Sequence, residues 1–182
     1  MKNLKETIGF IGAGNMATAL ISGLINSDQN ASKIIASSPE QEHLEKLSKD
    51  FGIKTTSDNL EVIDIADIVI LAVKPNIVQA VIDEIKDSAI DKDILIISIA
   101  AGVKIKKIES QLGSHIRVIR AMPNTPASIM EGVTAICPNS NAQSNDIENA
   151  KLLFECVGKI ALINEKDICL LYTSPSPRDV CS

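Results

Sequence analysis

Glycines and an alanine near the start of the chain are spaced as in a loop that binds phosphate. The segment Gly12-Ala13-Gly14-Asn15-Met16-Ala17 has the pattern G-x-G-x-x-A. Gly12 permits a tight turn, Gly14 lets the main chain approach a pyrophosphate, and Ala17 is small enough for the next helix to pack on the preceding strand. Backbone N–H groups at the start of that helix attract an anion. The pattern predicts a dinucleotide-binding loop, and glycines that serve only a tight turn are the alternative.

Two serines stand where a dinucleotide-binding domain distinguishes NADP from NAD. NAD enzymes place an Asp or Glu about twenty residues beyond the glycine loop, where it accepts a hydrogen bond from the ribose 2′-hydroxyl. This sequence has Ser37 and Ser38 there, whose hydroxyls can donate to a 2′-phosphate without repelling it. NADP(H) is therefore the favoured cofactor. Two alternatives stay open, because Ser38 can cap the following helix and Glu40 supports the use of NAD(H).

The surrounding sequence predicts the elements that position these residues. Short β-branched segments alternate with segments of helical period, which is typical of repeated βα units. Strands are expected at residues 7–11, 33–36, 53–55, 68–73, 94–99 and 117–122, and helices at 15–24, 39–51, 60–65, 76–85 and 104–112. Edge strands at 133–137 and 159–163, flanking a helix at 146–157, close the far side of the sheet. The predicted fold class is α/β, a Rossmann-type doubly wound, mostly parallel sheet with helices on both faces.

Three further segments follow predicted strands and are candidate walls of the same site. They are Leu71-Ala72-Val73-Lys74-Pro75, Ser98-Ile99-Ala100-Ala101-Gly102 and Ile119-Arg120-Ala121-Met122-Pro123-Asn124-Thr125-Pro126. Ligands of open α/β sheets bind beyond the carboxyl ends of the strands, so all three are expected to face the crevice at the glycine loop. The alternatives are that Lys74 is a solvated lysine and that the two prolines of the last segment only stiffen a loop.

Composition excludes several other classes of protein. The 182 residues suffice for one well-packed domain. A net charge of −5, three phenylalanines, one tyrosine and no tryptophan argue against a nucleic-acid partner. Four cysteines without C-x-x-C spacing and two histidines predict neither a metal site nor a disulfide framework. The apolar stretch at 8–13 is too short for a signal peptide or a membrane span, so we expect a cytoplasmic protein without a membrane partner.

Together with Gly9-Phe10-Ile11-Gly12-Ala13-Gly14-Asn15-Met16, the three strand-end segments resemble pyrroline-5-carboxylate reductase, the last enzyme of proline biosynthesis. The resemblance extends from about Thr7 to Asn164 and rests on the combination of A-V-K-P, S-I-A-A-G and R-A-M-P-N-T-P. It implies an oxidoreductase that transfers hydride from NADPH to the C=N carbon of the cyclic imine 1-pyrroline-5-carboxylate, giving proline. A protonated imine is already an electrophile, so no nucleophilic residue is required. We therefore assign no catalytic residue and no proton donor.

The resemblance also implies roles for individual residues. Cofactor-binding residues are Ile11, Gly12, Ala13, Gly14, Asn15 and Met16 at the pyrophosphate, Ser37 and Ser38 at the 2′-phosphate, Asn59, then Ala72, Val73, Lys74 and Pro75 around the nicotinamide, and Ile99, Ala100 and Ala101 near its ribose. Residues next to the substrate are Met122, Pro123, Asn124 and Thr125. For Asn59, capping the helix that begins at Leu60 is the alternative.

The end of the chain departs from the family. Two Ser-Pro steps after Asp167 disfavour helix, so we expect an NADP-binding domain at 1–166 and a disordered tail at 167–182. The resemblance implies a further helical domain, beginning near Gly-Ser-Gly-Pro-Ala-Tyr, that makes the family oligomeric and supplies much of the substrate pocket. That stretch does not occur in this sequence.

We therefore expect a truncated or mis-assembled reading frame, natural truncation being the alternative, with impaired catalysis by this chain alone. The alternative functions are a dinucleotide-binding module without turnover and a β-hydroxyacid dehydrogenase relative. The expected absence of a helical partner also predicts an exposed apolar patch near residues 159–163.

Overall fold

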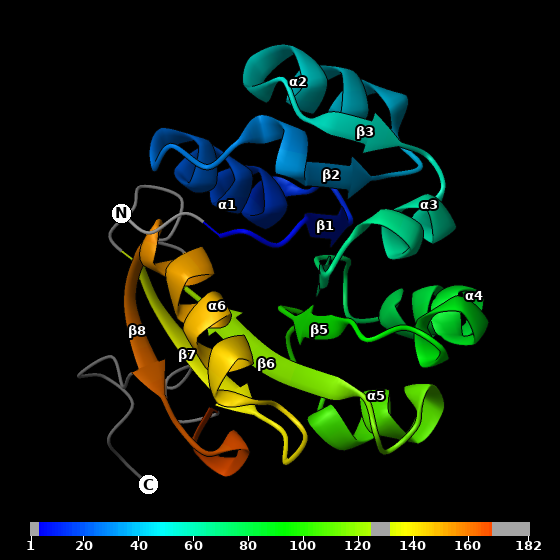
Figure 1. Ribbon diagram of the computed structural model, residues 1–182, viewed down its shortest axis with the longest axis vertical. Coiled ribbons are helices and arrows are strands. Elements are labelled where there is room, and N and C mark those ends of the chain that lie inside the picture. Colours follow the sequence, from blue (N-terminus) through cyan, green and yellow to red (C-terminus); the bar gives the residue numbers. More distant parts are fainter. Residues whose placement is uncertain (1–3, 125–131, 169–182) are drawn as a thin grey trace, which may run out of the picture.

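The computed structural model describes residues 4–124 and 132–168. Within these residues eight strands form one sheet in the order β3-β2-β1-β4-β5-β6-β7-β8 (Figure 1). The strands are β1 (Ile8–Ile11), β2 (Ile34–Ser37), β3 (Lys54–Thr56), β4 (Ile68–Leu71), β5 (Leu95–Ser98), β6 (Arg117–Pro123), β7 (Gly132–Pro138) and β8 (Gly158–Leu162). Among these described strands, β6 and β7 are the one antiparallel pair of neighbours.

Helices cover both faces of this sheet. One face carries α1 (Asn15–Asn26), α2 (Gln41–Phe51) and α6 (Ser144–Glu155), and the other carries α3 (Asn59–Ile65), α4 (Val78–Ile90) and α5 (Ile105–Leu112) (Figure 1). Consecutive side chains of a strand point to opposite faces, so Phe10 packs in the first core and Ile11 in the second. The predicted α/β, doubly wound, mostly parallel fold is confirmed.

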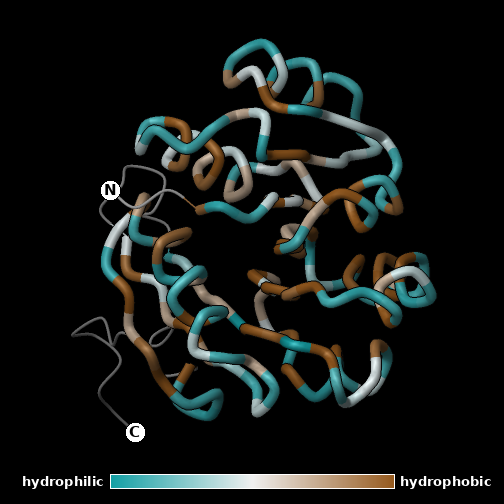
Figure 2. The backbone as a smooth tube through the Cα atoms, viewed as in Figure 1, coloured by the Kyte–Doolittle hydropathy of each residue, from teal (hydrophilic) through white to brown (hydrophobic). Residues whose placement is uncertain are grey.

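The central strands are apolar because both of their faces are covered. Every residue of β1, β2, β4 and β5 is buried, and β4 consists of isoleucine, valine and leucine alone. Parallel sheets with helices on both sides favour such continuous apolar strands. Figure 2 shows β2 and β5 largely brown and the outer side of α2, at the top, largely teal. Burial of the strands thus holds their carboxyl ends in a rigid row.

Several element boundaries differ from the prediction. Helix α2 begins at Gln41 rather than at Pro39, because Glu40 has extended backbone and donates its N–H to the hydroxyl of Ser38. Helix α4 continues to Ile90 rather than ending at residue 85, since Ala89 prolongs its buried side. Strand β7, predicted at an edge, lies inside the sheet because β8 pairs with it in parallel.

The described fold continues through the predicted domain boundary at residues 166–167. After β8, a short 3-10 helix (Glu165–Asp167) leads to Ile168, which is buried in the second core. The remainder of the predicted tail lies outside the described residues, and so does Thr125. In the predicted apolar patch at 159–163, Leu162 is 55% exposed while Ile160 is partly buried.

Substitution of Gly9 by alanine is expected to lower the free energy of unfolding by about 2 kcal/mol. A Cβ at Gly9 would overlap Val62 Cγ1 and lie 2.8 Å from Ala66 Cβ, so α3 would have to move away from β1. Urea unfolding followed by circular dichroism measures the change. A Cβ at Gly14 meets nothing within 4 Å, so Gly14→Ala is the matched control, with an expected loss below about 1 kcal/mol. Equal losses in the two variants would contradict the packing argument.

Candidate dinucleotide-binding site

The loops that follow β1, β2, β4 and β5 lie side by side at one edge of the sheet. Backbone hydrogen bonds join them: Gly12 N–H donates to Ser37 O at 2.9 Å, and Ala72 N–H donates to Ile11 O at 2.8 Å. Further along the same edge, Ile99 N–H donates to Leu71 O at 3.2 Å. Segments far apart in the sequence therefore meet at the carboxyl ends of these four strands.

The glycine loop has the geometry that a phosphate group requires. Gly12 has φ +104°, and a Cβ there would lie 2.7 Å from Ala72 O, so the turn accepts only glycine without strain. Gly14 has extended backbone, and a Cβ there would project into open space. No side chain caps the start of α1, and its first turn contains no acidic residue. Backbone N–H groups at this end therefore stay available for an anion, and the loop fits a pyrophosphate.

Next to this loop lies a pocket of about 330 Å³ that is lined by both apolar and polar residues. Val73, Ile77 and Val81 supply apolar surface, while Ser38, Asn59 and Glu84 supply polar atoms. The described residues that line it are Ile11, Gly12, Ser37, Ser38, Pro39, Ser57, Asn59, Val73, Ile77, Ala80, Val81 and Glu84. A flat apolar base with a polar ribose phosphate is the kind of ligand that such a pocket accommodates.

The two serines after β2 differ in what their hydroxyls do. Ser37 is fully buried, and its hydroxyl donates to Asn59 Oδ1 at 2.6 Å. Ser38 Oγ accepts the N–H of Glu40 at 3.1 Å, which leaves its hydrogen available for a ligand. The Ser38 hydroxyl thus accepts the backbone N–H of the residue that precedes α2 and can also donate to a phosphate. Ser37 instead holds the side chain of Asn59, which lines the pocket.

Asn59 lines this pocket and is the first residue of α3. The residue that caps α3 is Asp58, whose carboxylate accepts Leu60 N–H at 2.8 Å. The alternative that Asn59 caps the helix is therefore wrong. The Asn59 amide is instead held between Ser37 and Glu84, which accepts its Nδ2–H at 2.8 Å.

The other predicted residues continue along the same edge of the sheet. Lys74, Pro75 and Ala101 are exposed, and Ala72 and Ile99 are partly buried. Asn15 is exposed and Met16 partly buried at the start of α1, while Ala13 and Ala100 are buried.

The predicted substrate-side segment lies at the end of β6. Met122 and Pro123 are partly buried, and Asn124 Oδ1 accepts Val133 N–H at 2.9 Å. Two strands, β4 and β5, lie between β1, which leads into the glycine loop, and β6. The substrate-side role of this segment stays a prediction.

The sequence prediction missed the contribution of α4 to the pocket. Ala80, Val81 and Glu84 lie in the first half of this helix, and Ile77 directly precedes it. Because β4 is the neighbour of β1, the helix that follows β4 must begin beside the glycine loop. That topology was the available signal, but periodicity alone did not show which side of α4 faces the pocket.

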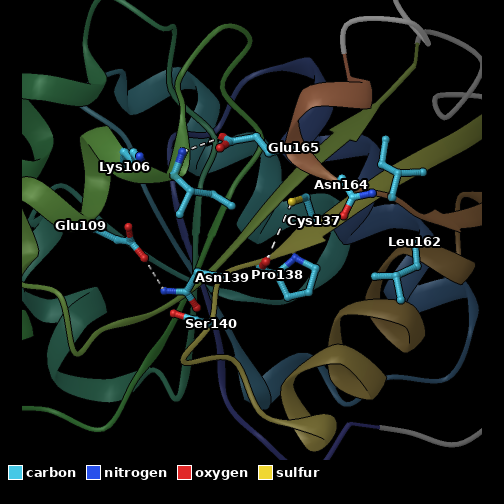
Figure 3. Close-up of a pocket in the computed structure, with 11 residues that line it drawn as sticks. Lys106, Glu109, Cys137, Pro138, Asn139, Ser140, Leu162, Asn164 and Glu165 are labelled. Carbon is cyan, nitrogen blue, oxygen red and sulfur yellow. Dashed lines mark hydrogen bonds between the residues drawn. The ribbon is translucent and has the colours of Figure 1, made fainter.

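A larger groove, of about 640 Å³, lies between α5 and the segment after β8 (Figure 3). One of its charged groups is already used inside the protein, because Glu165 Oε1 accepts Ile105 N–H at 2.7 Å and pairs with Arg120 at 3.2 Å. The described lining residues are Ile105, Lys106, Glu109, Cys137, Pro138, Asn139, Ser140, Leu162, Ile163, Asn164 and Glu165. None of the predicted cofactor residues is among them, so the smaller pocket is the candidate site.

The described cysteines are poor nucleophiles. Burial raises the pKa of the Cys156 thiol to about 12, and burial followed by the nearby Glu165 carboxylate raises that of Cys137. Both thiols are therefore protonated at neutral pH. Residues 4–124 and 132–168 contain no group of three or more His, Cys, Asp and Glu that could hold a metal ion. Over the same residues, no helix has the length and apolar character needed to cross a membrane.

Comparisons with known proteins point to one family of reductases. Residues 7–102 match the family model described as NADP oxidoreductase, coenzyme F420-dependent. The chain is 40% identical over 163 residues to the pyrroline-5-carboxylate reductase of Escherichia coli K12, a match that covers 89% of this chain and 60% of that protein. The chain thus spans about 60% of the length of the curated relatives it matches.

Solved structures agree with this similarity. A pyrroline-5-carboxylate reductase from Coxiella burnetii superposes with a TM-score of 0.90 at 34% identity, covering 93% of this chain and 63% of that one. The pyrroline carboxylate reductase of Plasmodium falciparum, solved with NADP bound, gives a TM-score of 0.80 at 32% identity, covering 90% of this chain and 60% of that one.

Proposed function

We propose a function from the premise that this chain belongs to the family of NADP oxidoreductases matched by residues 7–102 and, within it, forms the N-terminal NAD(P)-binding domain of a pyrroline-5-carboxylate reductase. The proposal is that it binds NADPH and, in the complete enzyme, serves the reduction of 1-pyrroline-5-carboxylate to proline. The observation that carries it is the open, uncapped start of α1 at Gly14, beside a pocket that contains Ser38 and Asn59.

The residues of the loop bind and orient the cofactor. Backbone N–H groups from Gly14 onward would hold the pyrophosphate. Ala72 and Ala100 have small side chains, which leave room for the nicotinamide ribose to approach the main chain. NADPH, when bound, supplies the hydride that the imine carbon accepts. The segment from Met122 to Asn124 would lie next to the substrate and help to orient it. Thr125 is proposed to extend this segment.

NADP(H) is preferred over NAD(H) in this proposal because no carboxylate replaces Ser38 at the end of β2. The Ser38 hydroxyl can donate to a 2′-phosphate, whereas an acid at this position would repel it. Glu40 lies two residues after Ser38 and directly precedes α2. The homologue from Plasmodium falciparum, solved with NADP, supports the same choice.

Substitution of Ser38 by aspartate should therefore shift the preference toward NADH. Aspartate keeps an oxygen that can accept Glu40 N–H, but its charge should weaken NADPH binding about tenfold or more. Fluorescence titration of both reduced cofactors measures the two dissociation constants. Ser38→Ala, which removes the donor without adding charge, should weaken NADPH binding less and leave NADH binding unchanged. An unaltered NADPH-to-NADH affinity ratio in the aspartate variant would contradict the assignment.

A direct test of the proposed function uses the purified chain. We expect it to bind NADPH weakly and to show little imine-dependent NADPH oxidation. A version of the gene extended to the full length of the relatives should restore oxidation that depends on 1-pyrroline-5-carboxylate. Binding of NADPH without turnover in the extended protein would instead support a dinucleotide-binding module. A chain that does not bind NADPH would contradict the proposal itself.

A further inference from the structure

We propose that Glu84 is a positioning residue for the adenosine end of the cofactor, because its carboxylate fixes the orientation of the Asn59 amide. The inference rests on the proposed binding of NADPH. It concerns a residue that neither the glycine pattern nor the strand ends predicted.

Three elements contribute to one chain of hydrogen bonds beside the pocket. Glu84 Oε2 on α4 accepts Asn59 Nδ2–H at 2.8 Å, and Asn59 Oδ1 on α3 accepts the Ser37 hydroxyl at 2.6 Å. The Oγ atom of Ser37, at the end of β2, lies 3.4 Å from Phe10 O in the neighbouring strand. Helices α3 and α4 pack side by side on the same face (Figure 1). The chain of hydrogen bonds therefore links two helices to the sheet beside the pocket.

Glu84 decides which end of the Asn59 amide faces which neighbour. An ionised carboxylate only accepts hydrogen bonds, so it requires the Nδ2 end of the amide. The Ser37 hydroxyl can either donate or accept, so it tolerates both orientations. With one Nδ2 hydrogen on Glu84 and Oδ1 on Ser37, the second Nδ2 hydrogen can be donated to an oxygen of a bound nucleotide. Without Glu84, the amide loses the contact that selects this orientation.

The hydrogen bond between Glu84 and Asn59 is also expected to strengthen when a ligand covers it. Glu84 is exposed and Asn59 partly exposed in the absence of ligand, so water competes with their hydrogen bond. Both side chains line the pocket, and a bound adenosine would exclude that water and strengthen the contact. Among the described residues that line the pocket, Glu84 carries the one charged side chain. Its charge also opposes a phosphate, so the test must separate hydrogen bonding from charge.

The test measures the affinity of the full chain for NADPH and for adenosine 2′,5′-bisphosphate by titration. Glu84→Ala should weaken binding of both by about five- to tenfold, the loss of one charge-assisted hydrogen bond. Glu84→Gln keeps an oxygen acceptor at the same reach and should restore affinity to within about twofold of wild type. Asp87→Asn is the matched control: it removes the same charge from the exposed side of α4, outside the pocket, and should leave both affinities unchanged.

Each other outcome overturns the inference. Tighter binding by both Glu84 variants would show that repulsion of the phosphate outweighs positioning. Equal losses in Glu84→Gln and Glu84→Ala would show that charge, rather than an acceptor for Asn59, matters. Wild-type affinity in Glu84→Ala would show that Glu84 does not position the cofactor, while leaving the proposed NADPH binding intact. Failure of the wild-type chain to bind either ligand would overturn the proposed function and this inference together.

Discussion

Replacement of Gly14 by valine should abolish NADPH binding while the chain stays folded. A Cβ at Gly14 meets nothing within 4 Å, and its φ of −74° suits any residue, so the protein itself can accommodate the side chain. The side chain would instead occupy the space above the uncapped start of α1, where the pyrophosphate must approach the backbone. We expect the dissociation constant to rise at least about 100-fold, which corresponds to about 3 kcal/mol of lost binding free energy.

A glycine elsewhere in the chain provides the opposite control. Gly52 ends α2 with φ +67°, and a Cβ there also meets nothing within 4 Å. Gly52→Ala should therefore cost about 1 kcal/mol of stability through backbone strain alone and leave the NADPH affinity unchanged. Titration with NADPH and urea unfolding of both variants separate the two effects. Retained affinity in Gly14→Val would show that the cofactor phosphates do not bind at this loop.

Substitution of Asp146 by alanine should lower the free energy of unfolding by about 3 kcal/mol. The Asp146 side chain is only 3% exposed, and its Oδ1 lies 2.6 Å from Arg117 Nη1. Its Oδ2 accepts Gln143 N–H at 2.7 Å and completes the capping box at the start of α6. The substitution therefore removes a helix cap and leaves an arginine, 19% exposed, with one carboxylate fewer. Equilibrium unfolding in urea measures the loss.

The same arginine supplies a matched control. Asp93 pairs with Arg117 Nη2 at 2.8 Å, but its side chain is 95% exposed, so water screens the pair. Asp93→Ala should cost less than about 1 kcal/mol. Both aspartates lie near the start of β6, at the edge of the sheet opposite the glycine loop, so neither change should alter the NADPH affinity. Equal destabilisation by the two variants would show that burial does not set the strength of these ion pairs.

The two edges of the sheet are thus expected to differ in role. One edge is proposed to bind the cofactor, and the opposite edge carries ion pairs that stabilise the fold. The carboxyl ends of β1, β2 and β4 carry backbone groups and small side chains, which leave open space for a ligand. At the other edge, Arg117, Asp146 and Asn149 line a polar pocket in which Arg117 is paired with both Asp93 and Asp146. The contrast explains why both edges are polar although only one is proposed to bind the cofactor.

Local sequence determined the glycine loop proposed to bind phosphate and the order of the elements. The properties that matter at Gly12 and Gly14 are the missing side chains and the backbone angles that they permit, and these depend on residue type and immediate neighbours. Alternation of apolar strands with helical segments likewise predicted the doubly wound sheet, because burial on both faces requires that composition. Resemblance to a family added the substrate, which no local pattern contains.

Only the tertiary structure decided how the polar side chains of the pocket are used. Ser37 and Ser38 are adjacent and chemically identical, yet the first points into a hydrogen bond with Asn59 and the second stays available to a ligand. Glu84 enters the pocket because α4 packs beside α3. Hydrogen bonds between residues more than twenty positions apart depend on the angles at which helices pack on the sheet. Those angles result from the whole core and cannot be obtained from the spacing of residues in one segment.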